Sequence, residues 1–485
     1  MNKTPMNKTS IEEKQNKPRE RKWHEKQPKQ PKANTNAEKR LFGTDGVRGK
    51  ANKFPMTAGI ALKLGQAASL VLSEKSHKNG TKPKFIIGKD TRISGYVFEY
   101  ALASGLCSTG SDVFLIGPLP TPAIAHLTKS FAADAGIVIS ASHNPFDDNG
   151  IKFFDSRGYK LSDEIEMQIE SLVFSGIDDS LFSPKKVGKA YKINDAQGRY
   201  IEFAKSTVSN ISLKGIKIVL DCANGAAYKV APLIFSELGA EVITIANKPD
   251  GLNINLGCGA LYPERLKALV LENKADIGIA LDGDADRVII IDEKGNNIDG
   301  DHIMALSAIY MKEKGLLKNN TVVATVMSNL GFELAMKKHG INLIRTNVGD
   351  RYVSEALRKG KYSLGGEQSG HIIFSDHTTT GDGTITALQV LRIMKEKAAP
   401  LSELANVFVP VPQVLLNAEV REKIPVEEMP SVVKKIKDSE GPDTRILVRY
   451  SGTENKLRVM VEGNDTIAIT RIAESIIREV KKYTG

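Results

Sequence analysis

Three segments of the sequence follow the same order of strand, loop, helix, glycine and strand. They lie at residues 82–117, 213–245 and 319–346. In each, a nearly continuous apolar run of the kind found in buried parallel strands leads into a loop of small residues. A helical segment then ends at Gly110, Gly239 or Gly340, because glycine readily adopts the positive φ that closes a helix. The next strand begins at once, so each segment predicts two parallel strands joined by a helix.

This repetition predicts three related α/β domains in tandem, with parallel or mixed sheets. The end of the chain differs, because strand-like runs at 411–420, 445–449 and 456–463 alternate with helical runs at 429–438 and 466–482. That order predicts a C-terminal α+β domain with a largely antiparallel sheet. The expected boundaries are a tail at 1–40, α/β domains at 41–195, 196–296 and 297–405, and the α+β domain at 406–485.

The net charge of +10 belongs mainly to the tail. Residues 1–40 hold twelve Lys or Arg and five Glu, and they contain few apolar residues. We therefore expect a disordered tail. The alternative is a basic arm that contacts a nucleic acid such as RNA, or a membrane surface. No run approaches the length of a membrane span, and no secretory signal is recognisable. The three cysteines are scattered, which favours a reducing cytoplasm.

The run from 135 to 154 carries the first candidate for catalysis. A β-branched strand leads directly into Ser142 and His143, and Lys152 follows an acidic turn. A hydroxyl at the end of a strand, next to an imidazole and near an ammonium group, is a candidate covalent catalyst.

Three alternating carboxylates, Asp282, Asp284 and Asp286, predict a metal site. An EF-hand loop is excluded, because Arg287 stands where that loop needs glycine and the flanking segments are strands. Three carboxylates leave coordination positions for water and phosphate, which suits Mg²⁺.

Five further loops suit a phosphorylated sugar. Residues 41–49 place Arg48 in a glycine-rich turn near an anion, and residues 88–95 continue this pattern. Residues 364–374 project Glu367 and Ser369 toward sugar hydroxyls, although a structural turn is an alternative. Residues 345–353, with Gly349 and Arg351, form another polar loop at a strand end, where ligands of parallel sheets bind. Residues 449–463 form a phosphate cradle from Arg449, Ser451, Gly452, Thr453 and Arg458.

Taken together, the motifs ISASHNP, DGDADR, GGEQSGH and RYSGTE resemble the α-D-phosphohexomutase superfamily over the whole body from Leu41 onward. The stretch GTDGVRG, Gln368 and residues 253–264 are most similar to the bacterial phosphoglucosamine mutases. Ala285 departs from the pattern, because the family usually has glycine there, and Tyr450 replaces a usual proline.

The resemblance implies four domains around a central cleft and a phosphorylated Ser142. It implies that the phosphoserine, Asp282, Asp284 and Asp286 hold Mg²⁺, and that Arg48, His143 and Lys152 surround the reacting phosphoryl group. Glu367, Ser369 and the loop of Gly349 and Arg351 would bind the sugar. Arg449, Ser451, Gly452, Thr453 and Arg458 would bind the phosphate that is not transferred.

The implied reaction interconverts glucosamine 6-phosphate and glucosamine 1-phosphate through glucosamine 1,6-bisphosphate, in the cytoplasm, for amino-sugar nucleotide and cell-wall synthesis. A homodimer is also expected. Phosphoglucomutase or phosphomannomutase activity is an alternative, as are a metal-dependent phosphatase and a non-catalytic sugar-phosphate sensor. The general base stays open between Lys152, His143 and His371.

Overall fold

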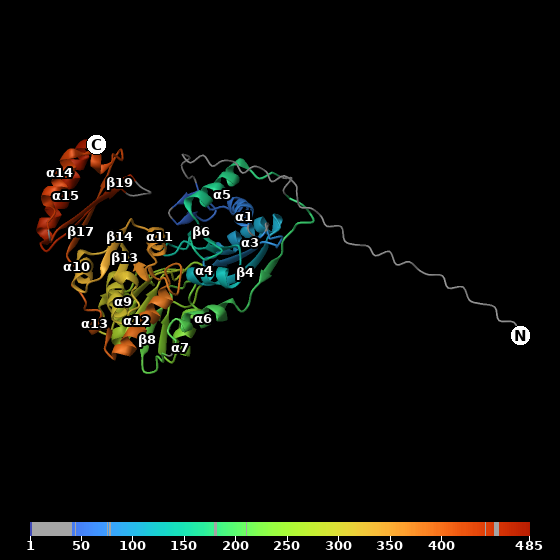
Figure 1. Ribbon diagram of the computed structural model, residues 1–485, viewed down its shortest axis with the longest axis horizontal. Coiled ribbons are helices and arrows are strands. Elements are labelled where there is room, and N and C mark those ends of the chain that lie inside the picture. Colours follow the sequence, from blue (N-terminus) through green and yellow to red (C-terminus); the bar gives the residue numbers. More distant parts are fainter. Residues whose placement is uncertain are drawn as a thin grey trace. The chain divides into compact units, whose positions relative to one another are not determined.

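The computed structural model describes Met1 and residues 41–485, apart from positions 44, 75, 77–78, 179–181, 210, 442 and 451–454. Beyond Met1, the predicted tail therefore lies outside the described residues. The described chain forms four sheets, which Figure 1 shows in sequence order from blue to red.

The first sheet has seven strands in the order β1-β2-β6-β5-β3-β4-β7. Strand β3 pairs in parallel with β4 and β5, and β4 pairs in parallel with β7. The other neighbours are antiparallel. The strands are β1 (Phe42–Gly43), β2 (Gly46–Lys50), β3 (Lys84–Lys89), β4 (Asp112–Pro118), β5 (Ala135–Ile139), β6 (Asp148–Asp155) and β7 (Ala190–Lys192). The helices are α1 (Ala58–Leu72), α3 (Gly95–Ser108), α4 (Thr121–Ser130) and α5 (Asp163–Ser175).

The second sheet has the order β12-β11-β10-β8-β9 and the third the order β14-β13-β15-β16. The second comprises β8 (Lys217–Asp221), β9 (Glu241–Ile245), β10 (Ile277–Leu281), β11 (Val288–Asp292) and β12 (Asn297–Ile298), with α6 (Ala196–Ser206), α7 (Val230–Glu237) and α8 (Glu264–Glu272). The third comprises β13 (Thr321–Thr325), β14 (Asn342–Thr346), β15 (Leu364–Gly366) and β16 (Ile372–Phe374). Its helices are α9 (Gly300–Glu313), α10 (Leu330–Lys338), α11 (Asp350–Gly360), α12 (Gly383–Lys397) and α13 (Leu401–Leu404), with the 3₁₀ turn η2 (Lys318–Asn320).

The three α/β sheets share one four-stranded core, which confirms the predicted repeat. The cores are β4-β3-β5-β6, β9-β8-β10-β11 and β14-β13-β15-β16. In each core three strands are parallel and the last is antiparallel to its neighbour. Each domain therefore ends its third core strand in a hairpin loop, at residues 140–147, 282–287 and 367–371. The exact domain boundaries stay a prediction, and β12 still pairs with the second sheet.

The C-terminal sheet is antiparallel throughout, in the order β17-β19-β18, as the sequence predicts. It comprises β17 (Gln413–Glu419), β18 (Arg445–Tyr450) and β19 (Lys456–Glu462), with η3 (Val426–Glu428), α14 (Pro430–Ser439) and α15 (Thr466–Thr484). Figure 1 shows α14 and α15 alongside this sheet. The Asp465 side chain caps α15 by accepting from the amides of Ile467 and Ala468. The helix buries Ile469, Ala473, Ile476 and Val480 at helical spacing.

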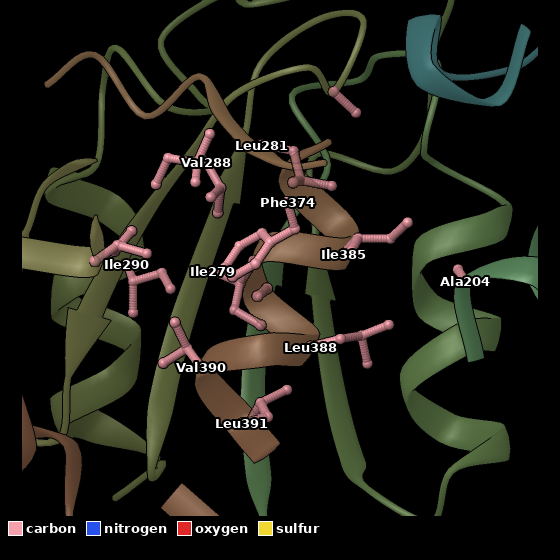
Figure 2. Close-up of a cluster of buried hydrophobic side chains, with 14 of the residues drawn as sticks. Ala204, Ile279, Leu281, Val288, Ile290, Phe374, Ile385, Leu388, Val390 and Leu391 are labelled. Atoms are coloured by element: carbon pink, nitrogen blue, oxygen red, sulfur yellow. The ribbon is translucent and has the colours of Figure 1, made fainter. Parts of the chain in front are cut away.

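Helix α12 contributes to one hydrophobic cluster that includes side chains from all three α/β domains. Figure 2 shows Ile385 and Leu388 of α12 gathered with Ile279 and Leu281 of β10. All four side chains are buried. The packing therefore ties the third domain to the second. Among the helices that the structure describes, none is long and apolar enough to span a membrane.

Helices α1 and α3 approach closely because glycines face one another. A Cβ atom on Gly105 of α3 would lie 2.1 Å from the Leu62 carbonyl oxygen of α1. A Cβ atom on Gly65 of α1 would lie 2.5 Å from the Leu102 carbonyl oxygen of α3. Both distances are far below van der Waals contact, so this helix crossing requires glycine.

We expect Gly105→Ala to lower the free energy of unfolding by about 1–3 kcal/mol, because the added methyl group forces the two helices apart. Gly59→Ala is the matched control, since Gly59 is a glycine of α1, the helix that Gly105 contacts, but nothing is within 4 Å of its Cβ position. That change should be neutral or stabilise by up to about 1 kcal/mol. Denaturant unfolding of both variants measures the difference. Equal effects would show that the close crossing contributes nothing.

Candidate active site

The hairpin loops of the three α/β domains contact one another. The Ser142 hydroxyl in the first loop donates to Asp282 Oδ2 in the second (2.6 Å). The Val288 amide, directly after the second loop, donates to the Gly370 carbonyl in the third (3.1 Å). A Cβ atom on Gly283 would lie 2.5 Å from the Ser142 carbonyl oxygen, so glycine allows the first two loops to meet. Three motifs more than 80 residues apart in sequence therefore form one site.

Ser142 is buried and has a strained backbone. Its φ is +53°, a left-handed conformation that costs a residue with a side chain about 1–2 kcal/mol. Its amide donates to Ser140 Oγ (2.9 Å), and His143 Nδ1 lies 3.4 Å from its hydroxyl. The tight turn directs the Ser142 hydroxyl at the acidic loop.

Arg92 and Asn255 hold the serine loop by its carbonyl groups. The fully buried Arg92 guanidinium pairs with Asp90 (2.8 Å) and donates to the loop. Asn255 Nδ2 donates to two of the same carbonyls, at 2.9 and 3.0 Å. The carbonyls that accept from Arg92 belong to Ser142 (2.8 Å), Asn144 (2.9 Å) and Pro145. These contacts keep the strained turn in place.

We expected residues 88–95 to continue the anion-binding pattern, and the structure places Arg92 differently. Its guanidinium faces carbonyl oxygens and the Asp90 carboxylate, so its charge is already compensated inside the protein. Arg92 therefore stabilises the backbone of the serine loop.

The acidic loop brings Asp282, Asp284 and Asp286 together. All three are buried, and one oxygen of each lies within 4.8 Å of the others. Among the described residues, Asp284 Oδ1 and Asp286 Oδ1 have no hydrogen-bond partner. Burial and the two neighbouring carboxylates raise the pKa of Asp282 well above its usual value. Three buried carboxylates with unused oxygens can hold a metal ion.

Lys152, on β6, supplies the nearest positive charge. Its Nζ lies 2.9 Å from Asp284 Oδ2, 3.2 Å from Asp45 Oδ2 and 3.7 Å from Asp286 Oδ2. Burial alone would lower the pKa of Lys152, but these carboxylates raise it above its ordinary value. Lys152 is therefore an ammonium ion here. Arg48 of β2 pairs with the same Asp45 carboxylate, so the predicted Arg48 and Lys152 do come together.

The two histidines of the site differ in their electrostatic surroundings. Burial, with Arg287 and Arg48 nearby, lowers the pKa of His143 to about 4. His371 is buried, and its Nε2 accepts a hydrogen bond from the Gly381 amide (3.0 Å). Nδ1 of the same ring faces Asp286 Oδ2 at 3.6 Å. Burial alone would lower the pKa of His371, but Asp286 and Asp350 raise it above its usual value. His371 orients a carboxylate of the acidic loop.

The expected sugar-binding residues divide into two groups. Glu367 is buried and accepts from the Gly349 amide (3.1 Å), so these two are brought together, while Ser369 of the same loop is exposed. Arg351 instead pairs with Asp163 and Glu166 of α5. Its contact with a substrate stays a prediction.

The two arginines of the expected phosphate cradle stand directly opposite each other. Arg449 of β18 and Arg458 of β19 are paired in register, and like charges at such positions repel. Burial and the neighbouring Arg458 lower the pKa of Arg449. An anion between them would relieve this repulsion. Ser451, Gly452 and Thr453 lie outside the described residues.

Sequence analysis also assigned no role in the site to two residues that contact the acidic loop. The Thr121 hydroxyl, at the start of α4, donates to Asp284 Oδ2 (2.6 Å), and nothing in the local sequence indicates this contact. Arg287 follows the three aspartates directly, and its amide donates to Asp282 Oδ1 (3.2 Å). Burial would lower the pKa of Arg287, but Asp286 and Asp282 raise it. Its position beside the acidic motif was the available signal.

Family models match four consecutive parts of the chain. They describe phosphoglucomutase/phosphomannomutase α/β/α domain I at residues 39–179, domain II at 198–295, domain III at 299–411 and the C-terminal domain at 415–479. The chain belongs to the phosphoglucomutase/phosphomannomutase family, whose members are phosphohexomutase enzymes. Its curated relatives narrow the assignment to the phosphoglucosamine mutases. It is 58% identical to the phosphoglucosamine mutase of Citrifermentans bemidjiense over 453 residues, which cover 92% of this chain and 99% of that protein. The corresponding protein of Pelobacter propionicus is 55% identical over 452 residues, with the same two coverages.

Solved structures support the fold. A phosphoglucomutase/phosphomannomutase family protein from Burkholderia thailandensis superposes with a TM-score of 0.75 at 25% identity, covering 91% of this chain and 97% of that chain. Aspergillus fumigatus N-acetylphosphoglucosamine mutase, solved with GlcNAc-6P and magnesium, gives a TM-score of 0.63 at 19% identity, covering 92% and 96%.

We expect Arg92→Lys to lower the free energy of unfolding by about 3 kcal/mol, because a lysine cannot pair with Asp90 and reach the serine-loop carbonyls together. Arg157→Lys is a matched control. Arg157 also pairs with the aspartate two residues before it, Asp155, but it is exposed. That change should cost less than about 1 kcal/mol. Denaturant unfolding of the two variants checks this, and a loss no larger in Arg92→Lys would refute the supporting role.

Proposed function

We propose that the chain interconverts glucosamine 6-phosphate and glucosamine 1-phosphate, with a phosphate carried on Ser142 between the two half-reactions. A hydroxyl of the sugar attacks the phosphorus of phospho-Ser142, and the bond from phosphorus to Ser142 Oγ breaks. The proton of the sugar hydroxyl ends on Ser142 Oγ. The resulting glucosamine 1,6-bisphosphate turns around, and Ser142 takes the other phosphoryl group by the reverse of the same step.

The observation that carries this proposal is the hydrogen bond from the Ser142 hydroxyl to Asp282 within the carboxylate triad. A serine used for acyl transfer would need hydrogen-bond donors that form an oxyanion site beside it. Here the serine faces three carboxylates instead. That arrangement suits a phosphoryl group whose charge is neutralised by a metal ion.

The residues present fit Mg²⁺. Asp282, Asp284 and Asp286 offer hard oxygen ligands, and two of their buried oxygens lack hydrogen-bond partners among the described residues. A phosphate on Ser142 would add a further oxygen. When bound, Mg²⁺ would neutralise charge on the transferring phosphoryl group.

The cationic side chains have the roles of charge neutralisation and positioning. Lys152 is an ammonium ion in this structure, so we assign it, with Arg48 and Arg287, to stabilising the phosphoryl oxygens. His143 is uncharged at neutral pH and lies 3.4 Å from Ser142 Oγ. It is therefore the better candidate to accept the proton of the sugar hydroxyl.

Sugar and distal phosphate would be held by the third and fourth domains. Glu367 and Ser369, with the loop of Gly349 and Arg351, would bind the hydroxyl groups. Arg449 and Arg458 would bind the phosphate that is not transferred, together with Ser451, Gly452 and Thr453. The repulsion between the two arginines supports this assignment. A cytoplasmic location, a homodimer and any nucleic-acid contact of the tail stay predictions.

We expect kcat/KM to be higher for glucosamine 6-phosphate than for glucose 6-phosphate or mannose 6-phosphate. The three substrates differ at the sugar 2-position, where glucosamine carries an ammonium group. Coupled assays on all three, with added Mg²⁺ and a hexose 1,6-bisphosphate, measure this order. A preference for glucose or mannose would instead indicate a phosphoglucomutase/phosphomannomutase activity. Release of inorganic phosphate without isomerisation would indicate a phosphatase.

Ser142→Ala should lower turnover by at least about 10³-fold, because no phosphate can be carried.

Asp284→Asn should lower turnover by about 10²–10³-fold while leaving the fold intact, because it weakens charge stabilisation. Asp376→Asn, at an exposed partner of Lys318, is the control and should keep full activity. Peptide mass mapping of the active wild type should find phosphate on Ser142. An active enzyme whose Ser142 is always unmodified contradicts the mechanism.

A further inference from the structure

Six side chains from the three α/β domains form a closed circuit of charge contacts at the site, which we call the charge ring. Its members, in order, are Asp45, Lys160, Asp350, His371, Asp286 and Lys152. Lysines alternate with aspartates, except that His371 stands between Asp350 and Asp286, 3.7 Å from the first and 3.6 Å from the second. Five members lie within the sequence motifs already described. Lys160 is the exception, since no motif includes it.

Lys160 pairs with residues of two loops that have separate roles in the proposed reaction. The loop of Asp45 carries Arg48, and the loop of Asp350 carries Gly349. Its Nζ pairs with Asp45 Oδ1 and with Asp350 Oδ2, and only 13% of its side chain is exposed. Asp45 also pairs with Arg48 and Lys152, which face the reacting phosphoryl group in the proposal. The three cations hold the pKa of Asp45 well below its usual range, even though burial alone would raise it.

Asp350 connects the other end of Lys160 to the sugar-binding side. Asp350 is the first residue of α11, directly after Gly349, whose amide donates to Glu367. Next to it, Arg351 pairs with Asp163 and Glu166 of α5. Arg351 and Lys160 therefore attach the start of α11 to the first domain. Of these two cations, Lys160 also pairs with Asp45, in the loop that carries Arg48.

The backbone of Lys160 is fixed as well. Lys160 forms an isolated antiparallel bridge with Phe154 on β6, the strand that also carries Lys152. The Gly158 carbonyl two residues earlier accepts from the Thr379 hydroxyl of the third domain. A rigid backbone and a bridged side chain leave Lys160 little freedom, so it can set a distance between the loops.

We propose that Lys160 is a positioning residue that fixes the sugar-binding loop of Gly349 and Glu367 relative to Arg48 and Lys152. The inference rests on the proposed mutase function for its kinetic consequence. The sugar must present two different hydroxyls in turn to the same phosphoserine, so the spacing between these loops governs both half-reactions. A displacement of about 1 Å at a reacting centre can cost about 10²-fold in rate.

The test compares Lys160→Met, Lys160→Arg and Asp350→Asn with the wild type, using glucosamine 6-phosphate with saturating Mg²⁺ and bisphosphate. Lys160→Met should lower kcat by about 10²-fold and change KM by less than about threefold. Lys160→Arg, which can still reach two carboxylates, should recover most of kcat. The double variant Lys160→Met/Asp350→Asn should lose no more than the worse single variant, because both remove the same bridge.

Lys205→Met is the matched control. Lys205 also bridges two carboxylates from different helices, Glu202 and Glu237, at 2.6 Å each, but it lies on the surface away from the ring. It should keep wild-type kinetics. Unchanged kcat in Lys160→Met, or fully additive losses in the double variant, would overturn the inference.

A second measurement is independent of turnover. Amide hydrogen exchange in peptides covering 346–353 should become faster in Lys160→Met and stay unchanged in Lys205→Met. Unchanged exchange there would also overturn the inference. A wild-type protein without mutase turnover would refute the proposed function, while the exchange result would still decide whether Lys160 positions the loop.

Discussion

Mutual repulsion among three buried carboxylates is the constraint around which this site is arranged. Asp282, Asp284 and Asp286 lie within 4.8 Å of one another and are almost completely buried. Unpaired buried charges are costly, so the surroundings must supply compensating groups. Among the described residues of the second domain, the compensating groups are the Arg287 amide and side chain. The other compensating groups come from elsewhere in the chain: Lys152, Thr121 and Ser142 from the first domain, and His371 from the third. The acidic loop therefore accounts for much of the polar contact among the three domains.

The repeated topology makes this convergence possible. Each α/β domain has the same parallel core and the same antiparallel return strand, so each presents one hairpin loop after its third core strand. A single structural position thus carries the serine in the first domain, the carboxylates in the second and Glu367 in the third. The first and second loops touch through Gly283, and the second and third through Gly370. A Cβ atom on Gly370 would lie 2.1 Å from the Val288 carbonyl oxygen. Chemical differences therefore arise from loop residues on an unchanged scaffold.

The repeat, the C-terminal antiparallel sheet and the acidic triad could all be predicted from sequence, because each depends on local periodicity or adjacent residues. Arg92, Asn255, Thr121 and Lys160 could not. The contacts that give these residues their place in the site join positions 50 or more residues apart. A single arginine or asparagine in a polar loop has no local feature that separates a buried residue from a surface residue. A comparison of Arg92 with Arg157 illustrates this limit of local sequence. Both follow an aspartate by two residues and pair with it in the same way, yet one is fully buried and the other exposed. Ala285 was a visible departure from the family pattern, and its φ of +56° explains why glycine is usual there.

Under the proposed function, the charge pattern of the C-terminal hairpin gives a reason for a separate sheet that binds the phosphate. At the base of the β18–β19 pair, Arg445 is in register with Glu462 and lies 3.1 Å from it, and Arg445 also donates to the Ser328 carbonyl of the third domain (2.9 Å). This opposite-charge pair anchors the hairpin. Four residues further along each strand, Arg449 and Arg458 form a like-charge pair. One end of the hairpin is thus stabilised by an opposite-charge pair, whereas the other would gain stability from a bound anion. Binding of a sugar phosphate would strengthen the hairpin at its free end while leaving its attachment unchanged. A phosphate at either end of the sugar satisfies this requirement equally, since two arginines recognise the phosphate group and not the carbon that carries it. That tolerance is what a mutase needs when its bisphosphate intermediate turns around.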